Sequence, residues 1–226
     1  MWVKICANTS LEDALMAADA GADAVGFVFA ESVRRVTFEQ VATITPHLPA
    51  SIEKIGVFVD AGLPDLIEAV EVCGLTGLQL HSMGDPELAQ RLRGHFGSGL
   101  RILQVIHYQQ GLEKELRSAE VNPSIDGVLV DSRTATLLGG TGQRFDWQGA
   151  RLGFAESATR LRLVVAGGLN AANVGEAIAT LRPWGVDVAS GVEASPGKKD
   201  PAKVRAFVEN ARVAAHPLDL AARVVV

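Results

Sequence analysis

The sequence predicts a single-domain α/β protein, a (β/α)8 TIM barrel, from three observations. Short apolar runs recur along the chain, helical patterns separate them, and 226 residues is an ordinary length for one such barrel. Strands that alternate with helices pair in parallel through crossovers, and strands that are apolar nearly throughout are typical of a sheet covered by helices. An open doubly wound sheet is the rival architecture, but it usually contains fewer strands.

Eight apolar runs are expected to form the strands of the barrel. Aromatic residues make up only 5% of the chain, so the core must consist mainly of Val, Leu, Ile and Ala, which suits a closed barrel. The predicted strands cover residues 3–7, 24–29, 53–59, 77–81, 101–107, 127–132, 162–168 and 185–190.

The segments between these strands carry helix signals. In SLEDALMAADAG the apolar residues fall on one helical face, Ser10 is a suitable N-cap, and Gly21 is a suitable stop. NAANVGEAIATL repeats the pattern with Asn170 in the cap position. We expect the barrel to occupy residues 1–213. The remaining residues, 214–226, are predicted to form a C-terminal tail whose role the pattern does not indicate.

Composition and charge exclude several classes of protein. The net charge of −5 argues against a nucleic-acid binder, which needs a basic face, although it permits a local cationic pocket for one phosphate. Two cysteines make neither a metal-ligand pair nor a disulfide framework, so a reducing cytoplasm is expected. No apolar run approaches the ~18 residues of a membrane span, and the N-terminus lacks a secretory signal. No pattern indicates the oligomeric state.

Polar residues that terminate strands are candidates for the active site, because the functional face of a barrel lies at the carboxyl ends of its strands. Side chains alternate along a strand, so Cys6 and Asp131 can both point into the mouth of the barrel. Their strands lie roughly opposite in a ring of eight, which outlines an acid/base pair across a ligand. The strand-end residues are Cys6, His81, His107, Asp131 and Ser190.

Each of these residues also has a purely structural interpretation. Cys6 can be a small buried hydrophobe, and Asp131 can cap the following turn. His81 is expected to line the site or to make a hydrogen bond, rather than to bind a metal. Lys4 is expected inside the barrel, paired with a carboxylate, and Cys73 is expected to fill space in a helix.

Three glycine-rich stretches follow the last predicted strands. AGGLN at 166–170 and ASGVEASPGKKD at 189–200 come after the seventh and eighth strands, where this fold usually binds phosphate through backbone N–H groups. LLGGTGQRFDW at 137–147 follows the sixth strand, and its glycines would allow a mobile cover over the mouth.

Several motifs, taken together, resemble phosphoribosylanthranilate isomerase, an enzyme family of tryptophan biosynthesis. The resemblance extends over residues 1 to about 213, and GGTGQRFDW and GVEASPGKKD are its most specific parts. The motifs appear in the family's order as VKICANT, DAVGFVF, SVRRVT, KIGVFV, LQLH, VDS, GGTGQRFDW, VVAGGLNAANV and VDVASGVEASPGKKD.

The resemblance implies an Amadori rearrangement that needs no cofactor and no metal. N-(5-phosphoribosyl)anthranilate would be converted to 1-(2-carboxyphenylamino)-1-deoxyribulose 5-phosphate. In the family pattern Cys6 is the general base and Asp131 the general acid, while Arg34 meets the anthranilate carboxylate; a count without gaps would point to Arg35 instead. The substrate-binding residues implied are Arg34, His81, Gly167, Gly168, Ser190 and Gly191.

The chemistry suits these residue types. Asp131 must carry a proton in order to open the sugar ring, and a thiolate can then remove the acidified C2 proton. A free thiol is only a few per cent ionised near pH 7. We therefore expect a lowered pKa at Cys6, with Lys4 on the same face as the cause.

One departure from the family pattern keeps other functions open. Ala7 and Asn8 stand where the family usually has glycine and an apolar residue, and alanine would be strained if that position needs a positive φ. One alternative is a barrel that only binds a phosphorylated ligand, although the presence of Cys6, Arg34 and Asp131 speaks against this. A related phosphosugar isomerase is a further alternative, but the histidine-pathway enzyme uses two aspartates. A Schiff-base aldolase would need a lysine nearer the mouth than Lys4.

Overall fold

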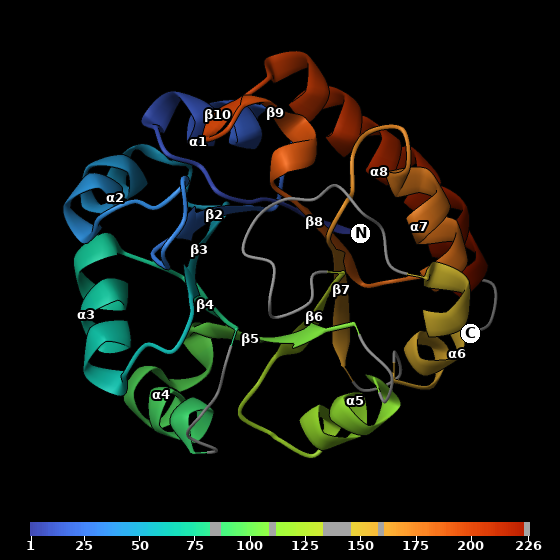
Figure 1. Ribbon diagram of the computed structural model, residues 1–226, viewed down its shortest axis with the longest axis horizontal. Helices are drawn as coiled ribbons and strands as arrows, with labels where there is room; N and C mark the ends of the chain where they lie inside the picture. The colour runs from blue at the N-terminus through green and yellow to red at the C-terminus, as the bar shows by residue number, and fades with distance from the viewer. Residues whose placement is uncertain (82–86, 109–111, 133–145, 158–160, 224–226) are drawn as a thin grey trace.

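Eight parallel strands form a closed barrel, as predicted. The computed structural model describes residues 1–81, 87–108, 112–132, 146–157 and 161–223. Each strand pairs with the next along the chain, and the last pairs with the first, so the sheet has no free edge (Figure 1). The strands are β1 (Trp2–Ile5), β2 (Ala24–Val28), β3 (Glu53–Phe58), β4 (Gly77–Leu80), β5 (Arg101–His107), β6 (Gly127–Asp131), β7 (Arg162–Ala166) and β8 (Gly185–Val188).

A ring of helices surrounds the barrel (Figure 1). A short hairpin of β9 (Glu193–Ser195) and β10 (Lys198–Lys199) follows β8, and the 3-10 turns are η1 (Thr45–His47), η2 (Gly97–Gly99) and η3 (Ser190–Val192). The helices are α1 (Leu11–Asp19), α2 (Phe38–Ile44), α3 (Leu63–Cys73), α4 (Leu88–Phe96), α5 (Leu112–Glu120), α6 (Trp147–Ser157), α7 (Val174–Leu181) and α8 (Pro201–Arg223).

Helix ends follow the predicted signals in α1 but not in α7. The Ser10 side chain accepts a hydrogen bond from the Asp13 backbone N–H at 3.2 Å, and Gly21 follows the helix with φ +89°. In contrast, α7 begins only at Val174. The Asn170 side chain accepts from the backbone N–H of Ala172 at 2.9 Å, which forms a local turn ahead of the helix.

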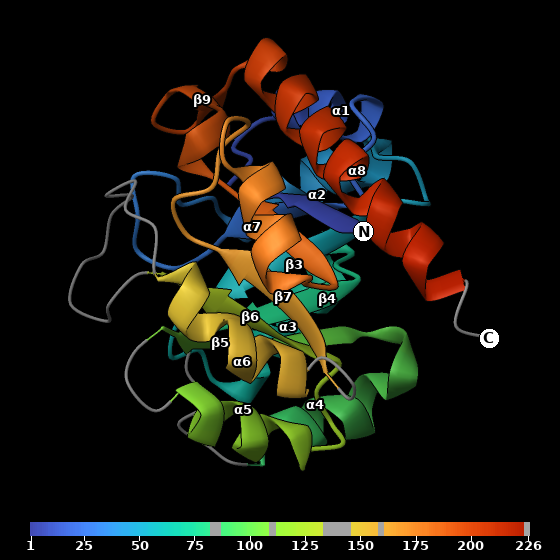
Figure 2. The same cartoon turned by 90° about the vertical axis from the view of Figure 1, so that its right-hand side faces the viewer.

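The last helix extends further than the predicted barrel boundary. Residues 214–223 of the predicted tail lie in α8, which runs to Arg223. This helix passes beside the N-terminus (Figure 2), where Arg212 donates to the main-chain oxygen of Met1 and to the carboxylate of Asp23. Over the part of the chain that the structure describes, no helix is both long and apolar enough to cross a bilayer.

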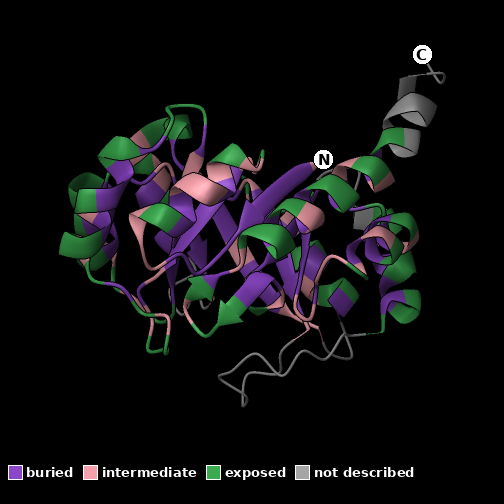
Figure 3. Ribbon diagram, turned by 90° about the horizontal axis from the view of Figure 1, so that it is seen from above, coloured by how far each residue is buried: buried purple, intermediate pink, exposed green. Residues whose placement is uncertain are grey.

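The barrel buries two layers of side chains. A large apolar cluster fills the space between the sheet and the helices, and the outward faces of the helices are exposed (Figure 3). Inside the ring, the apolar side chains share the space with polar ones, among which Lys4, Gln79 and Asp187 are buried. The apolar inner residues are Trp2, Ala24, Ile55, Leu103, Val105, Leu129, Val164 and Ala166.

Candidate active site

The carboxyl edge of the barrel carries every strand-end residue that the sequence singled out. Cys6 directly follows β1, and Asp131 is the last residue of β6. Leu129, two residues before Asp131, belongs to the inner cluster, so the Asp131 side chain also faces the interior. Both residues are buried, with 5% of Cys6 and 3% of Asp131 exposed. The structure therefore brings the two predicted catalytic residues to one edge and turns both inward.

The Cys6 thiol lies over Gly26 of β2, next to Lys4. A Cβ atom on Gly26 would lie 2.7 Å from Cys6 Sγ and 2.9 Å from Lys4 Cε, so only glycine leaves room for both side chains. Lys4 is fully buried, and its Nζ donates to Asp187 Oδ1 and to Gln79 Oε1, each at 2.8 Å. The predicted pairing of Lys4 with a carboxylate inside the barrel is thus confirmed.

The expected lowering of the Cys6 pKa is wrong. Burial removes water from the thiolate and raises the pKa of Cys6, and the positive charges of Lys4 and Lys199 offset this only in part. The carboxylate of Asp187 raises the pKa further. The sequence pattern indicated the neighbouring cation but not how completely the thiol is removed from water.

Ala7 and Asn8, which depart from the family pattern, form a tight turn directly after Cys6. Ala7 has φ +61°, a left-handed conformation that favours glycine, so the strain expected from the sequence is present. The Asn8 side-chain Nδ2 donates to the main-chain oxygens of Ile5 and Gly26 at 2.8 and 3.2 Å. Asn8 Oδ1 is buried and has no hydrogen-bond partner within the described ranges.

Ala7→Gly is expected to change the free energy of unfolding by less than about 0.5 kcal/mol. Relief of about 1–2 kcal/mol of left-handed strain offsets the loss of about 0.8 kcal/mol of methyl burial and the greater freedom of the unfolded chain. The matched control is Ala17→Gly, which removes an equally buried methyl from regular helix and should cost about 2 kcal/mol. Denaturant unfolding measures both variants, and equal losses would contradict the strain.

The activity of Ala7→Gly shows whether catalysis merely tolerates the strained turn at Ala7 or depends on it. The thiol precedes this residue, so a turn without strain is expected to give turnover at least equal to that of the unmodified chain. A fall in turnover would instead show that the Ala7 methyl, which is only 1% exposed, supports the position of Cys6.

Arg34 is held by a carboxylate that the sequence did not single out. Its Nε and Nη2 donate to the two oxygens of Glu193 at 2.8 and 2.7 Å, a bidentate arrangement that fixes the plane of the guanidinium. The hydrogen bonds from Arg34 offset the burial of Glu193 and lower the pKa of this carboxyl group. Arg35 is exposed, whereas Arg34 is half-buried. This difference favours Arg34, rather than Arg35, as the position that corresponds to the family arginine.

Lys199 completes this group of charges. It is 1% exposed, and its Nζ donates to Glu193 Oε1 and to the main-chain oxygen of Ala189, each at 3.2 Å. Burial lowers the pKa of Lys199, and Glu193 opposes that shift. Both residues stand inside the GVEASPGKKD motif, which was the signal available in the sequence.

The glycines after β7 and β8 allow close approaches between loops. Gly167 and Gly168 have φ +84° and +65°. A Cβ on Gly167 would lie 2.0 Å from Ser132 Oγ and 2.6 Å from Asp131 Oδ1, and one on Gly191 would lie 1.9 Å from the main-chain oxygen of Leu169. The loops after β6, β7 and β8 therefore meet at the carboxyl edge, where Ser190 begins η3.

Two histidines line the same edge: His81 directly follows β4, and His107 is the last residue of β5. The rings of His81 and His107 are 5.7 Å apart between centroids. Gln79 Nε2 lies 3.3 Å from His81 Nε2, which connects the edge to the buried Lys4. His107 is in register with Asp131 on the adjacent strand. Within the described residues, no group of three or more potential metal ligands is placed to hold an ion.

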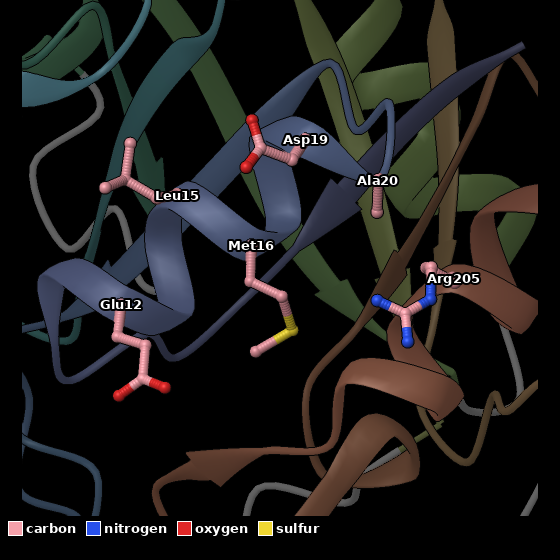
Figure 4. A pocket seen from close by; sticks show the side chains of 6 residues that line it. All are labelled: Glu12, Leu15, Met16, Asp19, Ala20 and Arg205. Atoms are coloured by element: carbon pink, nitrogen blue, oxygen red, sulfur yellow. The ribbon is translucent and has the colours of Figure 1, made fainter.

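Two further features lie apart from this edge or outside the described residues. A hollow on the outer surface lies between α1 and α8, and Figure 4 shows the side chains that surround it. It includes none of the predicted site residues; its lining is Glu12, Leu15, Met16, Asp19, Ala20 and Arg205. Most of the predicted cover over 137–147, namely residues 137–145, lies outside the described residues.

Comparisons with known proteins agree over nearly the whole chain. Residues 3–210 match a family described as N-(5'phosphoribosyl)anthranilate (PRA) isomerase. The N-(5'-phosphoribosyl)anthranilate isomerase of Pelobacter propionicus is 42% identical over 213 residues, covering 93% of this chain and 95% of that protein. The corresponding enzyme of Bacillus cereus strain B4264 is 41% identical over 212 residues, covering 94% and 98% of the two chains.

Solved structures show the same likeness. The phosphoribosyl anthranilate isomerase of Thermus thermophilus superposes with a TM-score of 0.81 at 31% identity, covering 94% of this chain and 99% of that one. A phosphoribosyl anthranilate isomerase in complex with reduced 1-(o-carboxyphenylamino)-1-deoxyribulose 5-phosphate gives a TM-score of 0.78 at 33% identity with the same coverage.

Proposed function

The chain belongs to the N-(5'-phosphoribosyl)anthranilate isomerase family, and we propose that it catalyses that family's Amadori rearrangement without a cofactor. The substrate would be N-(5'-phosphoribosyl)anthranilate and the product 1-(2-carboxyphenylamino)-1-deoxyribulose 5-phosphate. The observation that carries the proposal is that a thiol and a carboxyl group, Cys6 and Asp131, both face inward at the carboxyl edge of the barrel.

The two groups divide the proton transfers between them. Asp131 donates a proton to the ring oxygen of the sugar, the C1–O bond breaks, and the nitrogen lone pair forms a C1=N iminium. The iminium acidifies the C2 proton, which the Cys6 thiolate removes. The resulting enolamine takes up a proton at C1 and loses the proton of its C2 hydroxyl, which gives the C2 ketone. Each assisted transfer is worth about 10²–10⁴ in rate.

We assign the anthranilate carboxylate to Arg34. Two of the five guanidinium N–H groups are used on Glu193, and this pairing holds the fork in one orientation for a second carboxylate. Glu193 therefore acts as a positioning residue for Arg34. Glu193 is only 7% exposed, so its carboxylate is held next to Arg34 and does not rotate into solvent.

We assign the phosphate of the substrate to the loops after β7 and β8. Gly167, Gly168, Ser190 and Gly191 lie where these loops converge, and the backbone N–H groups of glycine-rich loops are common donors to a bound phosphate. His81 would line the sugar between this phosphate site and Gln79. The two cysteines are free thiols, which suits an enzyme that works on a small phosphorylated substrate in the cytoplasm.

A fluorescence assay of the unmodified chain tests the proposed function. The expected result is loss of the fluorescence of the anthranilate-linked substrate at a rate that increases with protein concentration. The double variant Cys6→Ser/Asp131→Asn is the matched control for uncatalysed ring opening. Binding of a phosphorylated product analogue without turnover would contradict the proposal and favour a barrel that only binds. Turnover of a different phosphorylated aminosugar alone would favour a related isomerase with altered substrate.

A further inference from the structure

We propose that Lys4 is the counter-ion of the Cys6 thiolate and so acts as a positioning residue for the base. The inference rests on the proposed function, in which Cys6 removes the C2 proton. Lys4 lies two residues before Cys6 on β1, and its side chain points into the barrel beneath the thiol. It does not reach the substrate, because Gln79 and Asp187 hold its Nζ within the polar layer of the interior.

The hydrogen bonds of Lys4 leave one proton for the sulfur. An ammonium group has three N–H donors, and the acceptors within the described residues are Asp187 Oδ1 and Gln79 Oε1, each at 2.8 Å. Cys6 Sγ and Lys4 Cε both lie within 3 Å of the position that a Gly26 Cβ would occupy. The sulfur and the end of the lysine are therefore neighbours, and each stabilises the charged form of the other.

Among the described residues, the charged side chains that interact with Cys6 or pair with its neighbours carry one more positive than negative charge. The cations that interact with the thiolate are Lys4, Lys199 and Arg34, whereas the carboxylates paired with them are Asp187 and Glu193. A thiolate at Cys6 balances this group.

Asp13 of α1 does not supply the missing anion beside the thiol. It accepts from the Lys199 backbone N–H at 3.3 Å, and it is not among the groups that shift the pKa of Cys6. Lys199 donates its own side-chain hydrogen bonds to Glu193 and Ala189. Lys4 has the strongest opposing effect on the burial of Cys6, ahead of Lys199.

Removal of Lys4 therefore affects the ionisation of Cys6 in two ways. The thiolate loses its nearest positive charge, and the carboxylate of Asp187, now unpaired, repels it. Both changes disfavour the thiolate. A base that is needed near neutral pH would then be almost entirely protonated.

Thiolate absorbance at 240 nm, measured against pH without substrate, tests the inference directly. The corresponding Cys6→Ser variant serves as the blank for each protein, so the difference reports Cys6 alone. Cys73 does not interfere, because it is present in both members of each pair and its absorbance cancels in the difference. Lys4→Met is expected to raise the Cys6 midpoint by at least about one pH unit, while Lys4→Arg keeps it within about half a unit of the unmodified protein.

Lys199→Met is the matched control, because it removes a second buried ammonium group whose charge lowers the pKa of Cys6 less than that of Lys4 does. It should shift the midpoint by less than Lys4→Met. An unchanged midpoint in Lys4→Met, or an equal shift in both variants, would overturn the inference. If the unpaired Asp187 prevents folding of Lys4→Met, the double variant Lys4→Met/Asp187→Asn supplies the test. The Cys6 midpoint of this double variant should still exceed that of Asp187→Asn alone. Equal midpoints in these two variants would overturn the inference.

Kinetics then separate this inference from the proposed function. In an active enzyme, Lys4→Met should move the pH profile of kcat/KM to higher pH, with KM changed less than kcat. A midpoint that shifts in a chain without isomerase activity would contradict the proposed function and leave the pairing of Lys4 with Cys6 intact. A shifted rate profile without a shifted thiol midpoint would contradict the pairing.

Discussion

Cys6→Ser is expected to lower turnover at least about a hundredfold, with little loss of affinity for a phosphorylated product analogue. The serine hydroxyl fits the space over Gly26, but it does not ionise near neutral pH, so it cannot remove the C2 proton. The phosphate and carboxylate contacts proposed for the ligand come from other loops and remain in place.

The fluorescence assay measures turnover of Cys6→Ser, and calorimetry measures its affinity for the analogue. Cys73→Ser is the matched control, since this second buried thiol lies at the end of α3 and donates to the main-chain oxygen of Phe38. Its turnover should equal that of the unmodified chain. Near-normal turnover in Cys6→Ser would refute the role of the thiol as base.

Asp131→Asn is expected to lower turnover by a similar factor, at least about a hundredfold, because an amide cannot deliver a proton to the ring oxygen. The amide has nearly the same shape as the carboxyl group, so it fits against Gly167 and Ser132 without a new clash. Affinity for the product analogue should change little.

A second carboxylate next to β6 provides the control for this variant. Asp126 precedes the strand at its opposite end, where it accepts from Arg93 and from the backbone N–H of Ile102, each at 2.7 Å. Asp126→Asn should reduce stability modestly and leave turnover unchanged. If Asp131→Asn kept most of the activity, the proton for ring opening would have to come from another group.

The fold was predictable because the apolar runs and helix signals in the sequence agree with the strands and helices of the barrel. Each strand is an apolar run long enough to be recognised, and the cap at Ser10 lies where its spacing from Asp13 places it. The start of α7 was missed because Asn170 is a good cap residue, and the sequence did not show that its side chain would close a local turn instead.

The candidate site was predictable only in part. Strand-end position and alternation identified Cys6 and Asp131 without any knowledge of contacts. The partners of Lys4 and Arg34 could not be found in this way, because Asp187 and Glu193 lie 183 and 159 residues away along the chain. The direction of the Cys6 pKa shift depends on burial against neighbouring strands, which a local pattern does not contain.

The register between β1 and β8 places Lys4 directly beside Asp187, so the two ends of the sheet are joined by a salt bridge as well as by backbone hydrogen bonds. During synthesis the ammonium emerges at the very beginning of the chain, and its carboxylate emerges only when the last strand does. In a nascent polypeptide that stops short of β8, the Lys4 ammonium lacks its carboxylate partner and therefore favours water. The interior of the incomplete barrel then stays accessible to solvent. Closure of the barrel is thereby coupled to the synthesis of β8, and truncated products that lack this strand are expected to be targets for proteolysis.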